Sequence, residues 1–334
     1  MTTNALVGYN TLMDVVNQYT SMDGQGTYIA AAKTLSRKCP LIAILPMMPS
    51  NQIMSNIGSR DAYLSTPGTR RFNEGVTPTA TKTTPFTDPI CIVEDYSEVD
   101  KALWMIQNDP NRWREGKDQR KVETMTQKAE NLLWYGNVAT DTAGINGVCT
   151  RFNSLTRRPN SDTAWPYNTV SAGGSGGDTT SIVVMQFGEG KVFGLYPKNL
   201  PGGLTIEDLG EVTKEESGKL MQVLRTHFVW NFGLSIEDER CVQRISNIEV
   251  SGTTNIFDED QLIVAINNLP DGGADPSTTI FVSRSVKNQL DIRAKDKNNV
   301  RYEMSEVWGQ TVTKFRGVPV MLAEKLLETE TAVA

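Results

Sequence analysis

The sequence predicts an α+β fold, and three observations support this class. A long amphipathic helix is expected after Pro110, and the second half of the chain alternates short β-like runs with two helical patterns. Before the long helix, residues 46–95 contain six prolines and no helical period of apolar residues, which indicates extended chain and turns rather than helix. The predicted body therefore contains both helices and strands. The extended segment has few apolar residues with which to form a hydrophobic core of its own.

Composition limits the classes of protein that this chain can represent. It has 334 residues, of which 39% are hydrophobic and 22% charged, as in ordinary globular proteins. The N-terminus lacks the basic and apolar blocks of a signal peptide, and no apolar run reaches the ~20 residues that span a bilayer. The net charge of −6 argues against a sequence-specific reader of nucleic acid, because such proteins usually carry a strongly basic face.

The four cysteines predict neither a disulfide framework nor a metal site. Cys39, Cys91, Cys149 and Cys241 lie far apart and form no CxxC pair, and the chain has a single histidine, His227. Buried, reduced thiols are the expected state of these residues.

The first 95 residues predict an arm followed by a ribbon. Apolar spacing favours one helix within residues 1–25 and a second over 27–38 that stops at Pro40. Alternation in "AYLST" and "TRRFNEGV" predicts two strands of a hairpin turned by "TPG" or "NEG". An isolated hairpin is marginal in water, so this ribbon requires another surface to lie on.

The helix after Pro110 is the longest element that the sequence predicts, at about 22 residues. Its apolar stripe consists of Trp113, Val122, Met125, Ala129, Leu132 and Leu133, and the glycine of "YGN" ends it. Beyond it, strands are expected at "SIVVMQFG", "KVFGLYPK", "KLMQVLRTHFVWNFGLSIED", "CVQRISNIEV", "STTIFVS" and "RGVPVMLAEKLL", and helices at "DEDQLIVAINNLP" and "RSVKNQLDIRAKDK".

A search for catalytic motifs finds none. No P-loop, dinucleotide fingerprint or GxSxG elbow occurs, and "GGSGGD" reads as a linker. His227 has no nameable partner and is expected to be structural. The acidic runs at 94–100, 237–240 and 258–261 lack calcium-loop spacing, so we expect solvated faces or salt bridges between chains, with "DED" at a helix start.

The order arm, ribbon, long helix and mixed body resembles the major capsid proteins of tailed bacteriophages. The strings "EDYSEVDKAL", "YGNVATDTAGINGVCTRFN", "GLYPK" and "DLGEV" are similar to the coat proteins of short-tailed phages of the epsilon15 type. The resemblance runs from about residue 40 to the end of the chain. It implies the HK97-type fold with an N-terminal arm (1–45), an extended loop or E-loop (46–95), a peripheral domain with a spine helix (96–150), and an axial domain with returning peripheral strands (151–334).

The resemblance also implies which residues carry the function. The extended loop would contact a neighbouring subunit, and the spine helix would support the peripheral domain. The residues assigned to the loop contact are Arg70, Arg71, Phe72, Glu74 and Lys82, and those assigned to the spine are Trp113, Val122, Met125 and Leu132. Some relatives crosslink a loop lysine covalently, and no motif here extends that chemistry to Lys82.

The expected function is therefore that of a coat protein with no enzymatic activity, cofactor or metal. Its partners would be copies of itself in hexamers and pentamers, a decoration protein, a scaffold, a portal and double-stranded DNA held without sequence preference. Assembly is expected in the bacterial cytoplasm, without a membrane. Two alternatives stay open: the shell protein of an encapsulin-like nanocompartment, and a metal-dependent enzyme that uses the acidic runs.

Overall fold

We describe the chain from a computed structural model that covers residues 39–159, 165–200, 202–294, 302–307 and 310–334. The two helices expected within residues 1–38 lie outside these residues, as does most of the predicted arm. The chain divides into two compact units. One contains residues 92–129 and 203–231, and the other contains residues 38–91, 130–202 and 232–334.

The larger unit is built around a seven-stranded sheet with the order β11-β12-β13-β10-β5-β9-β4. Antiparallel pairs join β5 to β9 and β10, whereas β10 and β13, and β4 and β9, run parallel. The strands are β4 (Thr169–Ser171), β5 (Thr179–Gln186), β9 (Val242–Glu249), β10 (Thr278–Val282), β11 (Tyr302–Val307), β12 (Gln310–Phe315) and β13 (Val318–Leu322).

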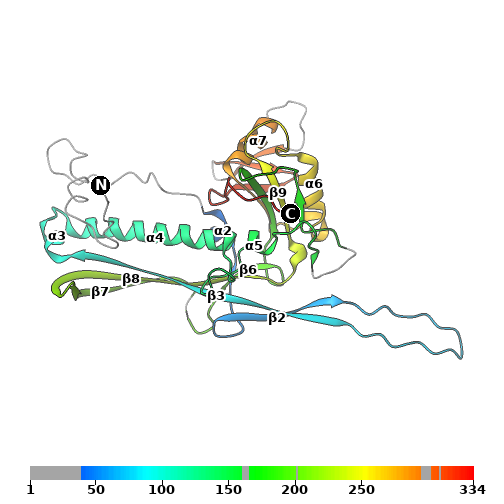
Figure 1. Cartoon of the computed structure of the whole chain (residues 1–334), viewed down its shortest axis with the longest axis horizontal. Helices are drawn as coiled ribbons and strands as arrows, with labels where there is room; N and C mark the ends of the chain where they lie inside the picture. Colours follow the sequence, from blue (N-terminus) through cyan, green and yellow to red (C-terminus); the bar gives the residue numbers. More distant parts are fainter. Residues whose placement is uncertain (1–38, 160–164, 201, 295–301, 308–309) are drawn as a thin grey trace. The chain divides into compact units, whose positions relative to one another are not determined.

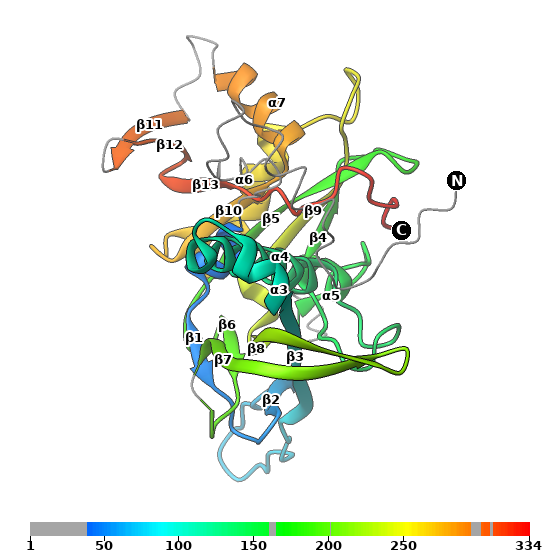
Figure 2. The ribbon, with the colours of Figure 1, turned by 90° about the vertical axis from the view of Figure 1, so that its left-hand side faces the viewer.

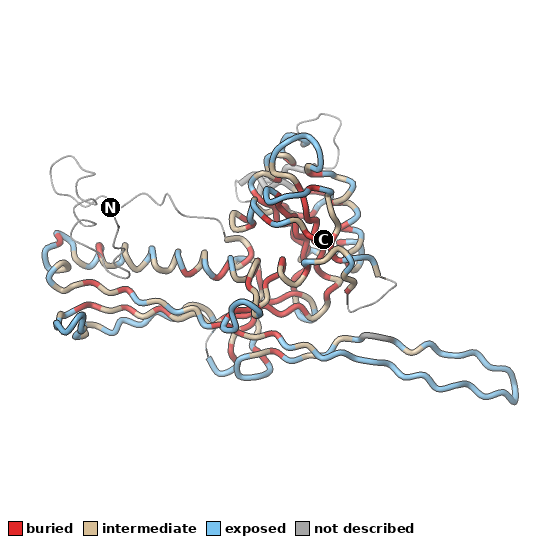
Figure 3. Tube along the Cα trace, viewed as in Figure 1, coloured by how far each residue is buried: buried red, intermediate tan, exposed pale blue. Residues whose placement is uncertain are grey.

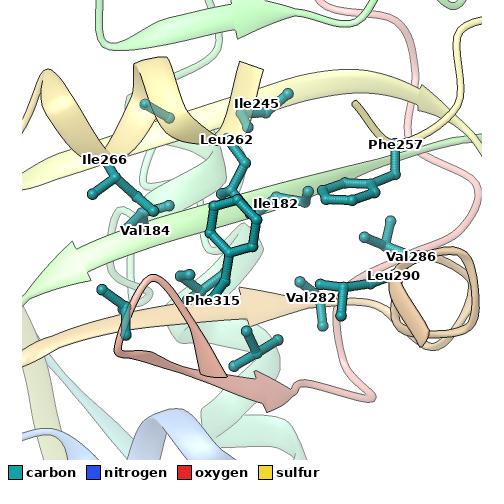
Figure 4. Packing of buried hydrophobic residues seen from close by; sticks show 14 of the residues in the cluster. Ile182, Val184, Ile245, Phe257, Leu262, Ile266, Val282, Val286, Leu290 and Phe315 are labelled. Carbon is teal, nitrogen blue, oxygen red and sulfur yellow. The ribbon is translucent and has the colours of Figure 1, made fainter. Parts of the chain in front are cut away.

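The core of this unit lies between the sheet and two helices, α6 (Glu259–Asn267) and α7 (Arg284–Ala294). Ile182 and Val184 of β5 pack there with Leu262 of α6 and Leu290 of α7 (Figure 4). Every residue of β5 is buried, which explains why its sequence is a continuous run rather than an alternation. The side chain of Asp258 accepts a hydrogen bond from the Asp260 N–H and caps α6, which confirms the predicted aspartate start.

A second sheet has the strand order β1-β6-β8-β3-β2, with β7 paired to β8 (Figures 1 and 2). Its strands are β1 (Met47–Pro49), β2 (Ser55–Tyr63), β3 (Lys82–Asp100), β6 (Val192–Tyr196), β7 (Gly203–Glu216) and β8 (Lys219–Ile236). β3 and β8 each have residues in both units. The strands expected at "KVFGLYPK" and "KLMQVLRTHFVWNFGLSIED" are confirmed as β6 and β8.

Helix α4 (Pro110–Tyr135) is the longest described helix and confirms the helix predicted after Pro110. It begins directly at the proline, which is tolerated in the first turn, and so is longer than expected. The described residues also form two shorter helices, α3 (Lys101–Ile106) and α5 (Val148–Arg151), and two 3₁₀ turns, Glu239–Cys241 and Pro270–Gly273.

The helix expected to stop at Pro40 lies outside the described residues, and a separate short helix, α2 (Pro40–Ile44), begins at this proline. The buried carboxylate of Glu130 in α4 accepts hydrogen bonds from the Leu41 and Ile42 N–H groups at 3.3 and 3.1 Å and from the Trp134 indole. Burial raises the pKa of Glu130, while these three donors oppose the shift. A partner almost 90 residues away in the sequence therefore satisfies the first turn of α2.

Several strands were not predicted from the sequence. β7 is polar along most of its length, and β4, β11 and β12 were also missed, as was α3. The strand expected at "TRRFNEGV" is wrong: residues 64–81 form no strand, and β2 pairs instead with the chain that starts at Lys82.

The cysteines are thiols, and Cys91, Cys149 and Cys241 are buried as expected, whereas Cys39 is half-buried. Burial raises the pKa of both Cys149 and Cys241 to about 12.

Because the thiolate is the reactive form, we expect Cys149 and Cys241 to resist a thiol reagent such as Ellman's reagent at pH 8 in the folded protein. Peptide mapping checks this result, and the urea-unfolded chain, in which all four should react, is the control. Equal labelling of Cys149 in both states would contradict the buried position.

Candidate assembly interface

The extended ribbon consists of β2 and the first part of β3, joined by a long tip. The two strands pair antiparallel, from Ser55 opposite Pro89 to Tyr63 opposite Lys82. The tip, residues 64–81, is exposed almost throughout and continues beyond the paired strands (Figures 1 and 3). The predicted ribbon is therefore present, with its second strand later in the sequence than expected.

The root of the ribbon is held by a buried ion pair. Asp88 on β3 has a side chain only 3% exposed and accepts a hydrogen bond from Arg151 of α5 at 2.7 Å. The other Asp88 oxygen accepts from the Ser235 hydroxyl at 2.9 Å, and Ser235 in turn accepts from Asn56 of β2. Because a buried carboxylate needs partners, this network fixes the position of β3 against β8 and α5.

A second contact holds β2 in place. Arg60 donates to the carbonyl oxygens of Ile236 and Glu237 and pairs with Glu239, which also pairs with Arg157. Burial lowers the pKa of Arg60, and the facing Glu239 opposes that shift. The guanidinium lies 4.1 Å from the centre of the Phe86 ring, a cation–π arrangement.

Phe86 can take this position because the residue opposite it is glycine. Gly58 pairs with Phe86, and a Cβ on Gly58 would lie 2.5 Å from the ring. An aromatic residue that covers a cross-strand glycine is a known way to fix strand register. The glycine of "NIG" and the phenylalanine of "TPF" could have indicated this pairing. The sequence analysis considered each segment separately and did not compare the two strings.

We expect replacement of Asp88 by asparagine to loosen the ribbon root. The change removes a charge that faces Arg151 and leaves the cation short of a partner, so the free energy of unfolding should fall by about 1–3 kcal/mol. Hydrogen exchange should become faster in residues 55–63 and 82–89. The matched control is Asp291→Asn, which removes an exposed i,i+4 partner of Lys287 and should change little. Unchanged exchange in the ribbon would show that Asp88 does not anchor it.

The tip contains most of the residues assigned to contact with a neighbour. The N–H of Glu74 donates to the Arg71 carbonyl at 3.3 Å and Asn73 has a φ of 65°, so the predicted "NEG" turn is confirmed. Phe72 is 99% exposed, and Arg70, Arg71 and Glu74 are also exposed. Lys82 lies where the tip meets β3. The tip therefore presents a large aromatic side chain and two guanidinium groups with no buried surface to hold them.

The residues assigned to the spine all lie in α4. Trp113 is buried and packs with Val99 and the partly buried Trp104, while Met125 is buried. Val122 and Leu132 are half-buried. These residues support the helix itself. The tip and the part of α4 that contains Trp113 belong to different units. The roles assigned to the residues of the tip and to the residues of the spine remain predictions.

Some residues of the acidic runs form ion pairs within the chain, which the sequence did not predict, while Glu94, Asp258 and Asp260 are exposed as expected. Asp95 pairs with Lys121 at 2.9 Å, and Glu98 pairs with Arg225 at 2.6 Å and with Lys214. Among the described residues, no group of three or more histidine, cysteine or acidic side chains is placed to hold a metal ion. The described helices include none that is long and apolar enough to cross a membrane.

His227 contacts two side chains of β3 that the sequence did not identify as its partners, and its structural role remains a prediction. Its ring stacks on Tyr96 with centroids 4.4 Å apart, and Nε2 lies 2.6 Å from Glu94. Hydrogen bonds from Tyr96 and His227 lower the pKa of Glu94. This cluster joins β3 to β8 across the sheet.

Comparison with known proteins relates this architecture to phage coats. The model of the family described as major capsid protein GP7 matches residues 23–334. No curated protein matches the chain.

The fold comparison includes the capsid protein structure of bacteriophage epsilon15, which is 24% identical with a TM-score of 0.75 over 98% of this chain and 99% of that one. More distant matches include the capsid of bacteriophage JBD30 (10% identity, TM-score 0.45, 93% and 95% coverage) and the SrpI encapsulin of Synechococcus elongatus (13%, 0.45, 73% and 98%).

The family match covers almost the whole chain and the epsilon15 structure shares its fold over nearly every residue, which confirms the HK97-like architecture expected from the sequence. The chain therefore belongs to the major capsid protein GP7 family and is a coat protein of a virion.

Proposed function

We propose that copies of this chain assemble as pentamers and hexamers into an icosahedral head shell, and that the exposed ribbon tip overlaps a neighbouring copy. One observation carries this proposal. The root of the ribbon is fixed by buried ion pairs, whereas the side chains of the tip are exposed and are not packed against other described parts of the chain. A projecting segment of this kind is a liability in a monomer and a joint in a lattice. Many modest contacts per copy then add up to a stable shell.

We propose that the shell encloses double-stranded DNA without reading its sequence and forms in the bacterial cytoplasm with a scaffold, a portal and a decoration protein. The net charge of −6 supports weak contact with phosphate. The protein acts through its geometry and needs no catalytic group or cofactor. The smaller unit with most of α4 corresponds in this proposal to the peripheral domain, and the seven-stranded sheet to the axial domain.

The test shortens the tip without disturbing the root. Tyr63 and Lys82 are cross-strand partners, so residues 64–81 can be replaced by Asn-Gly, which closes a two-residue hairpin. We expect a folded protein with a nearly unchanged thermal midpoint that forms no closed particles by negative-stain microscopy. In a control variant, residues 64–81 are replaced by glycine and serine at the original length, which separates the effect of the length of the tip from that of its side chains.

Normal shells from the shortened variant would contradict the proposed overlap. The nucleic-acid content of particles produced during infection separates a phage head from an encapsulin-like compartment, because only the head holds a full-length genome.

A further inference from the structure

Helix α4 carries three exposed cations in one row. Arg112, Arg120 and Lys128 follow one another at intervals of eight residues, and all three are exposed. Residues four apart on a helix form a continuous ridge, so these cations share the ridge that also includes Gly116 and Thr124. At 1.5 Å per residue, neighbouring cations are about 12 Å apart along the helix axis and the row extends about 24 Å. We call these three cations the α4 row.

Ion pairs within the chain do not occupy the α4 row. Of the four arginines in the described part of the smaller unit, Arg114 pairs with Asp208 of β7, and Arg225 pairs with Glu98 of β3 at 2.6 Å. The remaining two arginines both belong to the row. In the described structure, no cation of the row takes part in an ion pair. The arginines that face the strands are therefore neutralised by this chain, whereas the row remains available to a partner.

The ridge is low between its cations. Gly116 has no side chain, and the Thr124 hydroxyl donates to the Arg120 carbonyl at 2.9 Å, so it folds back onto the helix. A partner that approaches the ridge therefore meets the long cationic side chains first. In the adjacent row, Glu115 is exposed and opposes the attraction of an anion.

We propose that the α4 row binds phosphates of the double-stranded DNA inside the shell, and that this face of α4 lies on the inner surface. This inference rests on the proposed enclosure of DNA and names the residues that touch it. DNA carries about one negative charge per 1.7 Å of its axis, so a row of ~24 Å lies beside about 14 phosphates whatever the sequence. The planar guanidinium group of arginine suits phosphate because it donates two parallel hydrogen bonds.

The spacing of the row favours a polyanion over an acidic protein surface. Cations about 12 Å apart are separated by more than the Debye length of about 8 Å at physiological ionic strength, so each must find its own anion. A protein partner would need a carboxylate opposite each cation, whereas DNA presents a phosphate at every position. Three contacts per copy bind weakly, and the many copies of a shell add their effects without fixing the DNA in one register.

Opened shells of the full chain test the row. Empty shells are broken by freeze–thaw to expose the inner surface and are sedimented with a long labelled duplex at several salt concentrations. The row variant is Arg112→Gln/Arg120→Gln/Lys128→Gln, which removes three charges and keeps good helix formers. We expect shells at the parent yield, duplex binding at least about tenfold weaker, and a slope of log K against log salt that is smaller by about 2–3 per bound copy.

The control removes the same charge elsewhere. Lys198→Gln/Lys219→Gln/Arg293→Gln changes three exposed cations outside α4 and should bind the duplex within ~2-fold of the parent, because distant charges are screened. Glu115→Gln removes the carboxylate beside the row and should tighten binding. If the control weakens binding as much as the row variant does, net charge rather than the row explains the effect and the inference is overturned.

A crosslink tests the position of the row in the shell. Formaldehyde treatment of DNA-filled heads should link peptides that contain Lys128 to DNA, because a lysine amine can be joined to a nearby base. Intact empty shells with the long duplex added outside are the control and should give no such link. A link formed from outside would place the row on the outer surface and contradict the inference.

Assembly separates DNA from a protein partner. Folding of each variant is checked by circular dichroism and thermal midpoint. A folded row variant that forms no shells would show that the row contacts another copy or an assembly partner, which overturns the inference. If DNA-filled heads form and the row variant still binds the duplex like the parent, the proposed enclosure of DNA stands and its assignment to α4 falls. If the particles hold no genome, the enclosure itself falls.

Discussion

Replacement of Arg244 by methionine is expected to lower the free energy of unfolding by about 3–5 kcal/mol. The Arg244 and Glu330 side chains are 3% and 5% exposed, and Nη2 lies 2.9 Å from Oε2 of Glu330. Arg244 also donates to the Ser181 hydroxyl and to the carbonyl oxygens of Cys149 and Phe152. Methionine fills part of the volume but leaves the Glu330 carboxylate buried without its cation.

Urea unfolding of the tip-shortened protein, which is expected to remain a monomer, measures this loss. Arg284→Met is the matched control, because its ion pair with Glu324 involves a guanidinium side chain that is 67% exposed and should contribute less than about 1 kcal/mol. Adding Glu330→Gln to Arg244→Met should recover part of the stability, since no charge is then stranded. If the double variant is as unstable as the single one, the lost packing rather than the buried charge explains the effect.

The second large effect is expected at Gly147, immediately before α5. A Cβ at this position would lie 2.5 and 2.6 Å from the carbonyl carbon and oxygen of Trp134, which are backbone atoms in the last turn of α4. The Gly147 N–H also donates to the carbonyl of Gly136 at 2.8 Å, so the two segments are held close together. Because backbone cannot move aside as a flexible side chain can, Gly147→Ala should cost at least about 3 kcal/mol.

We expect Gly147→Ala to appear mainly in inclusion bodies, with a thermal midpoint several degrees lower in any soluble fraction. Gly177→Ala is the control, because its added Cβ would meet no atom within 4 Å and its φ is not in the left-handed region. A soluble Gly147→Ala protein with the parent midpoint would show that the close approach to Trp134 is not required.

The spacing of apolar residues within one segment predicted those helices and strands whose own side chains are buried in the hydrophobic core. The stripe that includes Met125 and Leu133 predicted α4, the apolar run of β5 predicted a buried strand, and Asp258 predicted the start of α6. These signals work because helical and strand periods place the apolar side chains of one segment on one face. The same reading showed that residues 46–95 are extended, since prolines and threonines without a helical period exclude the alternative.

Partners far apart in the sequence decided the rest. The start of α2 depends on Glu130, the ribbon root on Asp88 and Arg151, and the glycine of "GING" on the backbone of Trp134. β7 escaped prediction because an exposed edge strand needs no apolar alternation and is fixed by its pairing with β8. The sequence by itself thus determined the family, the long helix and an extended segment without a core. Only the tertiary structure decided where that segment is anchored and which strand edge stays open, because these depend on contacts between residues that are brought together only by folding.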